Sequence, residues 1–188
     1  MNKSQHIDKI LAAWPYEAES LNVRLAKGAD GRKIIQMRID MGLLQLEVQG
    51  RPDGTKPHGE ATFQDHLIAE SVRNHPDWTL SESQCGEVDR EFVQYYHRRM
   101  CWLKLREYHN AVSDADHTLC LMDFCGKHSP DDDWTHSHEQ YRPFVMFHRV
   151  HATALAALED DGADVAVQEI NLGLRQLKDE VFENVDQE

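Results

Sequence analysis

The first apolar residues of the chain recur with the period of a helix. They occupy positions i, i+3, i+4 and i+7: Ile7, Ile10, Leu11 and Trp14. This spacing places them on one face and predicts a short amphipathic helix. Ser4 is a favourable N-cap for this helix, and Pro15 ends it.

Between residues 23 and 48 the period of the apolar residues changes to two. Isoleucine and methionine alternate with polar residues over 35–41, and leucine and valine do so over 44–48. A shorter alternation at 23–25 precedes a turn with two glycines at 27–31. Alternation of this kind predicts strands with one buried face. The segment therefore predicts a three-stranded antiparallel β-meander.

The connection after the meander, GRPDGTKPHG at 50–59, is dense in turn-forming residues. From there on the apolar residues recur with the period of a helix again. This period predicts helices over 60–74, from Ser81 through Leu103, and over 110–125, 143–158 and 164–181, with a polar loop over 126–140. Ser81 and Gln84 have the spacing of a capping box.

Together these elements predict an α+β fold that is mainly helical. A three-stranded antiparallel β-meander near the N-terminus packs on a bundle or short solenoid of about six helices. Residues 1–59 hold the first helix, the meander and the connector, and residues 60–188 form the helical region, with hairpins at about 88–125 and 143–181. A chain of 188 residues can bury one core, so we expect one compact unit.

Charge narrows the range of partners. The chain carries 33 acidic and 20 basic side chains, a formal net charge of −13. Because such a surface repels phosphate backbones, direct nucleic-acid binding is not expected. No segment approaches the ~20 consecutive apolar residues of a membrane span, and no secretory signal is recognised. The four cysteines are too sparse for a secreted disulfide scaffold, so we expect a cytoplasmic protein.

One residue pattern occurs twice at a displacement of 55 positions (166 − 111). The first copy, Ala111, Val112, Ala115 and Leu119, matches Ala166, Val167, Ile170 and Leu174. The pattern resembles degenerate tetratricopeptide repeats, helical hairpins that stack into a solenoid. The alternative is two ordinary helical hairpins packed together.

Over the whole chain the sequence also resembles a group of uncharacterised planctomycete proteins. The resemblance rests on the stretches WPYE, GRPDGTKPHG, DREFVQYYHRR and HEQYRPFVMFHR. Members of this group are often labelled as carrying a UVR motif, the helical hairpin through which the UvrB and UvrC repair proteins meet. In this chain the motif would lie in 155–181, where Ala166-Val167 replaces its paired alanines and Glu169-Ile170-Asn171 replaces Leu-Arg-Asp. Both resemblances imply a helical hairpin that contacts another protein.

Three sets of residues are candidates for binding. The first is a set of metal ligands in the polar loop: Cys125, His128, His136 and His138. Cysteine and histidine at this spacing can close a tetrahedral zinc site, although the familiar CxxC pair is missing. The alternative is a solvated loop, so we expect no cofactor, with zinc as the alternative.

The second set lies in the 50–59 connection, where Arg51, Lys56 and His58 would bind an anion; the alternative is a rigid connector. The third set lies on the long helix, which concentrates the Tyr, Trp and Arg residues typical of binding hot spots. Its more polar flank is the candidate partner surface: Gln94, His97, Arg98 and Lys104.

No catalytic residue is proposed, because none of the common nucleotide-binding, metalloprotease or hydrolase motifs occurs. The sequence therefore favours a non-catalytic cytoplasmic adaptor or scaffold that presents helical hairpins to a protein partner, with a homodimer as one form of this. One alternative is a UVR-motif accessory factor associated with DNA repair through protein contacts. Another is a metal- or anion-binding protein, conceivably an enzyme, that uses the His-rich loop or the 50–59 connection.

Overall fold

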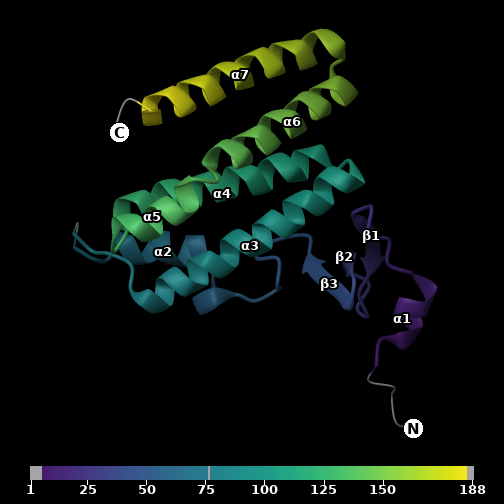
Figure 1. Ribbon diagram of the computed structural model, residues 1–188. Helices are drawn as coiled ribbons and strands as arrows, with labels where there is room; N and C mark the ends of the chain where they lie inside the picture. Colours follow the sequence, from purple (N-terminus) through teal and green to yellow (C-terminus); the bar gives the residue numbers. More distant parts are fainter. Residues whose placement is uncertain (1–5, 76, 186–188) are drawn as a thin grey trace.

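The computed structural model describes residues 6–75 and 77–185, with the backbone alone for 181–185. It confirms the predicted fold, which is α+β and mainly helical. The elements follow one another as α1 (Asp8–Ala13), β1 (Asn22–Lys27), β2 (Lys33–Ile39), β3 (Gly42–Glu47), a 3-10 turn η1 (Pro57–Gly59), α2 (Phe63–Ser71), α3 (Glu82–Leu105), α4 (Tyr108–His128), α5 (Asp132–Glu139), α6 (Arg142–Asp160) and α7 (Ala163–Val185) (Figure 1). Ser4, the predicted cap of the first helix, lies outside the described residues.

The three strands form an antiparallel sheet in the order β1-β2-β3, as the alternation of apolar residues predicted. In the middle strand Ile35 pairs with Leu25 on one side and Leu46 on the other. Ile35 and Met37 are buried in a cluster that also contains Trp102 of α3. The sheet therefore packs on the C-terminal half of α3.

The second face of β2 is buried as well, which the alternation did not predict. Gln36 and Arg38 are each 8% exposed. Gln36 accepts hydrogen bonds from Arg24, and Arg38 donates to the carbonyls of Trp14 and Gly42 at 3.0 and 2.8 Å. Polar side chains can line this face because each of their polar groups finds a local partner.

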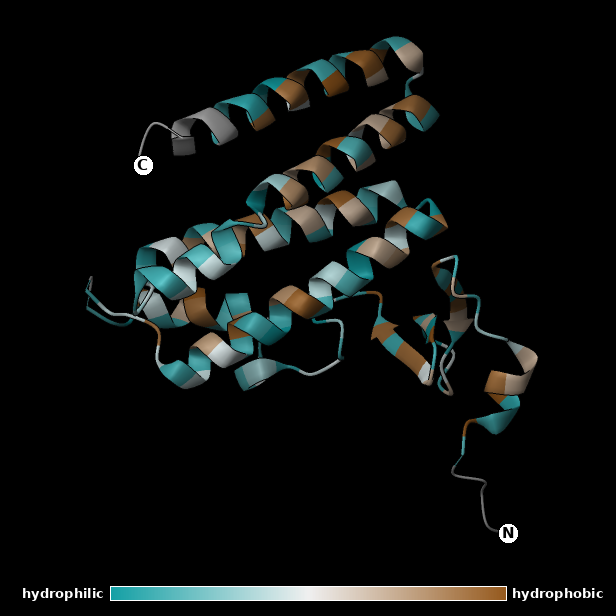
Figure 2. Ribbon diagram, in the orientation of Figure 1, coloured by the Kyte–Doolittle hydropathy of each residue, from teal (hydrophilic) through white to brown (hydrophobic). Residues whose placement is uncertain are grey.

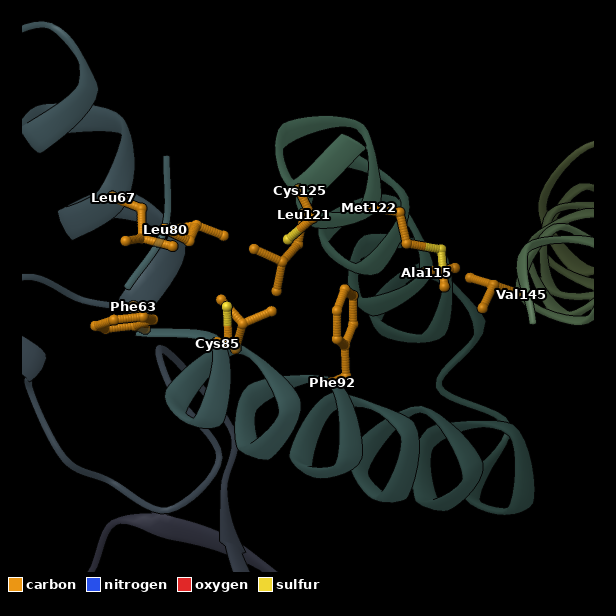
Figure 3. Packing of buried hydrophobic residues seen from close by; sticks show 11 residues of the cluster. Phe63, Leu67, Leu80, Cys85, Phe92, Ala115, Leu121, Met122, Cys125 and Val145 are labelled. Atoms are coloured by element: carbon orange, nitrogen blue, oxygen red, sulfur yellow. The ribbon is translucent and has the colours of Figure 1, made fainter. Parts of the chain in front are cut away.

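Four long helices lie next to one another in the order α3, α4, α6, α7 (Figure 1). Ser81 begins α3 with the predicted capping box on Gln84. Beside the N-terminal half of α3, α2 and α4 enclose the larger apolar cluster, in which Phe63, Leu67, Phe92 and Leu121 point toward one another (Figure 3). In the part of the chain that the structure describes, no helix is long and apolar enough to cross a membrane.

The predicted polar loop at 126–140 is wrong. α4 continues to His128, and residues Asp132–Glu139 form α5. Asp131 caps this helix by accepting a hydrogen bond from the Trp134 N–H at 2.7 Å, and acidic residues fill its first turn, where they suit the helix dipole. The helix escaped prediction because its only large apolar residue is Trp134, which leaves no apolar period to recognise.

The burial of the cysteines predicts their reactivity. Cys85, Cys101 and Cys125 are buried, and burial raises the pKa of each thiol, to about 12 for Cys101. Cys120 is exposed. We therefore expect native protein to react with one equivalent of a maleimide at neutral pH, at Cys120, because thiolate is the reactive form. Mass spectrometry after labelling checks this, and Cys120→Ser supplies the control; rapid labelling of any buried cysteine in folded protein would contradict it.

Gly173 predicts how closely α7 approaches α6. A Cβ added there would lie 2.3 Å from Cγ1 of Val150, whereas one added at Gly86 of α3 meets nothing within 4 Å. Gly173→Ala is therefore expected to lower the free energy of unfolding by about 1–3 kcal/mol through overpacking. Gly86→Ala is the matched control and is expected to raise it by about 0.5–1 kcal/mol through helix propensity. Urea unfolding measures both; stabilisation by both substitutions would disprove the close contact.

Candidate functional site

The connector between the sheet and α2 is held by its arginine. Arg51 is 3% exposed, and its guanidinium lies 2.9 Å from Glu87 and 3.5 Å from both Asp53 and Glu91. Because three carboxylates surround this cation, it is not available to an external anion. The geometry favours the rigid connector over the anion-binding loop.

The other two candidates for anion binding do not join Arg51 in one site. Arg51 and Lys56 line a shallow cavity of about 520 Å³ together with Arg32, which is itself paired with carboxylates. His58 lines a different cavity of about 650 Å³, where its ring stacks on His66 with 3.8 Å between the ring centroids. The predicted anion site is therefore not formed in this arrangement.

Glu91 joins three helices. Its side chain is fully buried, and its carboxylate accepts hydrogen bonds from the backbone N–H groups of Phe63 and Gln64 at 2.8 and 3.1 Å. These are the first residues of α2, so the carboxylate also suits the dipole of that helix. His117 of α4 completes the set, with its Nε2 3.0 Å from the carboxylate. Glu91 thus fixes where α2 and α4 meet α3.

Arg98, about two helical turns further along α3 than Glu91, connects the same helix to α4 and to the sheet. Its guanidinium donates two hydrogen bonds to Asp114 of α4 at 2.8 and 2.9 Å. It also donates to the carbonyls of Glu47 and Gly50 at the end of β3, and lies 4.6 Å from the ring centroid of Tyr95. A buried bidentate pair of this kind gives a fixed geometry.

Arg98 therefore lies inside the protein, and not on the partner surface where the sequence analysis placed it. It is 4% exposed, because the sheet and α4 cover that side of α3. Gln94 is half-buried and donates to Asp53 of the connector at 2.9 Å. His97 is half-buried, and burial lowers its pKa. Of the four residues, Lys104 alone is exposed, so the predicted polar flank does not form one surface.

Arg99 connects α3 to α4 and α6 on the other side of the helix. It is 1% exposed and donates to the Thr118 hydroxyl at 3.0 Å and to Nδ1 of His148 at 3.3 Å. Burial lowers the pKa of this arginine to about 10. The same environment lowers the pKa of His148 to about 4, through burial first and then through the nearby Arg99 cation. A neutral His148 can accept the hydrogen bond that holds α6 on α3.

The four candidate metal ligands are not brought together. Cys125 points into the core, and His128 lies with its Nδ1 3.0 Å from a backbone carbonyl. His136 and His138 are two positions apart on α5 and so lie on different sides of it: His136 is exposed, whereas His138 pairs with Asp89 at 2.9 Å. Among the described residues no three His, Cys, Asp or Glu side chains are placed to hold a metal ion.

The buried polar groups are almost completely satisfied. Within the described residues, the Thr153 hydroxyl is the one buried side-chain oxygen or nitrogen without a hydrogen-bond partner. The buried charges described above satisfy one another and position the helices.

Two of the long helices, α3 and α6, share an exposed surface that is apolar and aromatic. We call it the aromatic patch, and it consists of four exposed side chains on α3 and α6: Val93 (55%), Tyr96 (39%), Phe144 (45%) and Phe147 (54%). The rings of Tyr96 and Phe144 meet between the two helices at 6.5 Å, which makes the patch continuous across them. The hydrogen bond from Arg99 to His148 lies on the same two helices and fixes their spacing.

The repeated residue pattern is covered in one hairpin and exposed in the other. In α4, Ala111 and Ala115 are fully buried. In α7, Ala166 is buried, but the other three matching positions are exposed: Val167 (55%), Ile170 (42%) and Leu174 (56%). The structure thus has two antiparallel hairpins, α3–α4 and α6–α7, the second of which has an uncovered apolar side. Their relation to tetratricopeptide repeats stays a prediction.

No protein-family model matches the chain, and no curated protein or solved structure is significantly similar to it.

Sequence reasoning missed the aromatic patch, although a signal for it was present. The segment 143–158 carries apolar or aromatic residues on more than one side of a helix. A helix with so wide an apolar sector must either be covered on several sides or leave one exposed. The sequence gives the width of the sector, but only the fold shows which side remains open.

The low pKa of His148 predicts a pH dependence of stability. The pKa lies at about 4 in the folded protein against an ordinary 6.5, so between these values the unfolded chain binds more protons. The stabilisation from neutral His148 is then full above pH 6.5 and is lost as the pH falls toward 4, by about 2–3 kcal/mol. His148→Gln should remove this loss, seen as a flatter dependence of the unfolding free energy on pH. His136→Gln, at an exposed position, is the control; parallel profiles for wild type and His148→Gln would refute the prediction.

Proposed function

We propose that the chain is a non-catalytic cytoplasmic adaptor that binds another protein through the aromatic patch. The observation that carries this proposal is the continuous exposure of Tyr96, Phe144 and Phe147 on two adjacent helices. Aromatic side chains dominate the energetics of protein–protein contacts, because they bury a large area at a small loss of side-chain freedom.

The size of the patch supports the proposal. The exposed parts of its four residues add up to roughly 400 Å², if typical areas for such side chains are used. This is in the range of the largest apolar patches on monomeric proteins, which often have a function. Met41 and Val72 are also exposed, but they lie on separate parts of the chain, in the turn between β2 and β3 and at the end of α2.

The fixed packing of the helices beneath the aromatic patch also supports the proposal. Arg98, Arg99 and Glu91 hold α3 against the sheet, α2, α4 and α6 through buried hydrogen bonds. A surface that is already ordered loses less conformational entropy on binding than a flexible one. The buried charges would therefore contribute to affinity indirectly, by presenting the patch in one arrangement.

A repair-linked accessory role is a second proposal, and it rests on a different observation. The α6–α7 hairpin contains residues 155–181, where a UVR motif would lie if the resemblance holds, and its turn falls at Asp161 and Gly162. The two proposals differ in the partner rather than in the kind of activity. The identity of a captured protein distinguishes them.

Substitution of the patch tests the proposal. Phe144→Ser with Phe147→Ser should reduce the amount of a stoichiometric partner captured from host lysate by at least about tenfold, because each hot-spot residue contributes about 2 kcal/mol. Met41→Ser with Val72→Ser removes apolar side chains that are even more exposed, at 91% and 82%, from other parts of the surface, and should capture as wild type does. Circular dichroism confirms that both variants fold. Equal capture by the two double variants would sink the proposal.

A further inference from the structure

The helical layer ends in an apolar surface of its own. The outermost helix, α7, carries hydrophobic residues along its length (Figure 2). Three of them are exposed at i, i+3 and i+7, which is one side of a helix, and Leu158 at the end of α6 is 49% exposed. We call these four residues the aliphatic stripe: Leu158, Val167, Ile170 and Leu174.

The contact between α6 and α7 shows why this stripe is left open. Ala166 and Gly173 of α7 turn toward α6, where Gly173 lies directly against Val150. Val167 and Leu174 each follow one of these inward residues by a single position, so they lie about 100° further around the helix. The apolar sector of α7 is thus wider than the part that α6 covers.

The stripe continues onto α6 rather than away from it. Because α6 and α7 are antiparallel and Gly173 meets Val150, residues of the two helices whose numbers add up to about 323 lie side by side. Leu158 therefore lies level with the first turns of α7, beside Val167. On α6 it shares a side with Phe147, whose ring stacks on His151. The stripe thus lies on the same side of the layer as the aromatic patch.

The charge of this region differs from that of the chain as a whole. The chain carries 33 acidic residues, yet none occurs from Arg142 to Leu158 of α6. Glu169 is the one acidic residue between Val165 and Lys178 of α7, and the helical period places it on the flank opposite the stripe. Four acidic residues, Glu159, Asp160, Asp161 and Asp164, lie at the turn end of the stripe. A two-fold axis through the middle of the stripe places the two acidic turns at opposite ends of the contact, so a second copy meets mainly the neutral part.

We propose that a second copy of this chain covers the aliphatic stripe, so that two α6–α7 hairpins pack against each other across a two-fold axis. A two-fold contact needs a surface that is complementary to itself, and a neutral row of branched aliphatic side chains meets this need. The contact covers the exposed side of α7, the outermost helix of the layer, in both copies.

The area of the stripe sets the strength of the dimer. Its four residues expose roughly 350 Å² per copy, if typical side-chain areas are used. Because about 60% of such an interface is apolar, the dimer would bury about 1,200 Å² in total, near the lower limit for a specific interface. Contacts near this limit are typical of weak, transient complexes, so we expect a dissociation constant in the micromolar range.

The dimer does not depend on the proposed adaptor function. Phe147 and Leu158 are 11 positions apart on α6 (158 − 147), which is about 17 Å along a helix. By the same pairing of residue numbers, Leu174 at the other end of the stripe lies level with position 149 of α6 (323 − 174), close to Phe147. The two contacts therefore border on each other, and Phe144, five positions beyond that level (149 − 144), belongs to the aromatic patch alone.

Sedimentation equilibrium of the full chain, from about 1 to 200 μM, tests the proposal over the micromolar range that the area implies. Wild type is expected to shift from the monomer mass toward twice that mass. Val167→Glu with Leu174→Glu should weaken the dimer at least about tenfold, because it places charges in the apolar contact. Leu172→Glu is the matched control, since Leu172 is 48% exposed on the opposite flank of the same helix, and it should dimerise as wild type does.

A milder pair, Val167→Ser with Leu174→Ser, keeps the test decisive if the glutamate variant unfolds, and circular dichroism reports the folding of each variant. A wild-type chain that stays monomeric up to 200 μM overturns the proposal, as does equal weakening by Leu172→Glu. Loss of a captured heterologous protein on substitution of Val167 and Leu174, with a monomeric wild type, assigns the stripe to another partner and overturns it too. Phe144→Ser alone should keep the wild-type dimer while it weakens capture of a partner, so failure of the adaptor proposal is recognised separately.

Discussion

The buried pair of Arg98 and Asp114 joins three parts of the fold: α3, α4 and the end of the sheet. Arg98 comes from α3, Asp114 comes from α4, and the remaining donors of the guanidinium reach the carbonyls at the end of β3. Burying two charges costs several kcal/mol in desolvation, so the pair is weak as a source of net stability. Its effect is on the choice of arrangement, because a docking that buried Arg98 away from Asp114 would leave a charge without a partner.

Two consecutive arginines of α3 position different neighbours of that helix. Arg98 and Arg99 point about 100° apart around the helix, and so the first holds the sheet while the second holds α6 through His148. The position of α6 decides where Phe144 meets Tyr96, and hence whether the aromatic side chains form one patch or two separate spots. The aromatic patch thus depends on which buried residues pair with Arg98 and Arg99 inside the protein. The same arrangement leaves the outer side of α7 exposed.

Local patterns in the sequence predicted the elements well and the contacts poorly. The strands, the long helices and the Ser81 capping box depend on residues within a few positions of one another, and all of them are present. Arg51 and Arg98 were read as surface residues because their carboxylate partners lie 16 to 40 positions away, at Glu87, Glu91 and Asp114. The four candidate zinc ligands lie apart for a local reason: α5, which the sequence did not predict, places His136 and His138 on different sides of one helix. The aromatic patch could be suspected from the wide apolar sector of 143–158, but its exposure depends on which helices arrive on each side.

The close packing of α7 on α6 alone has a consequence for the motions of the protein. α7 packs on α6 through small residues such as Ala166 and Gly173, and α6 is its one extensive neighbour among the described elements. Regions with few buried contacts open with a lower free energy than the global unfolding transition. Among the four long helices, α7 is therefore the one most prone to detach as a cooperative unit, in the microsecond-to-second range of local unfolding. Each such event uncovers the alanines of α6, so any contact that covers the outer side of α7 would also slow the exchange of its amide protons and its cleavage by proteases.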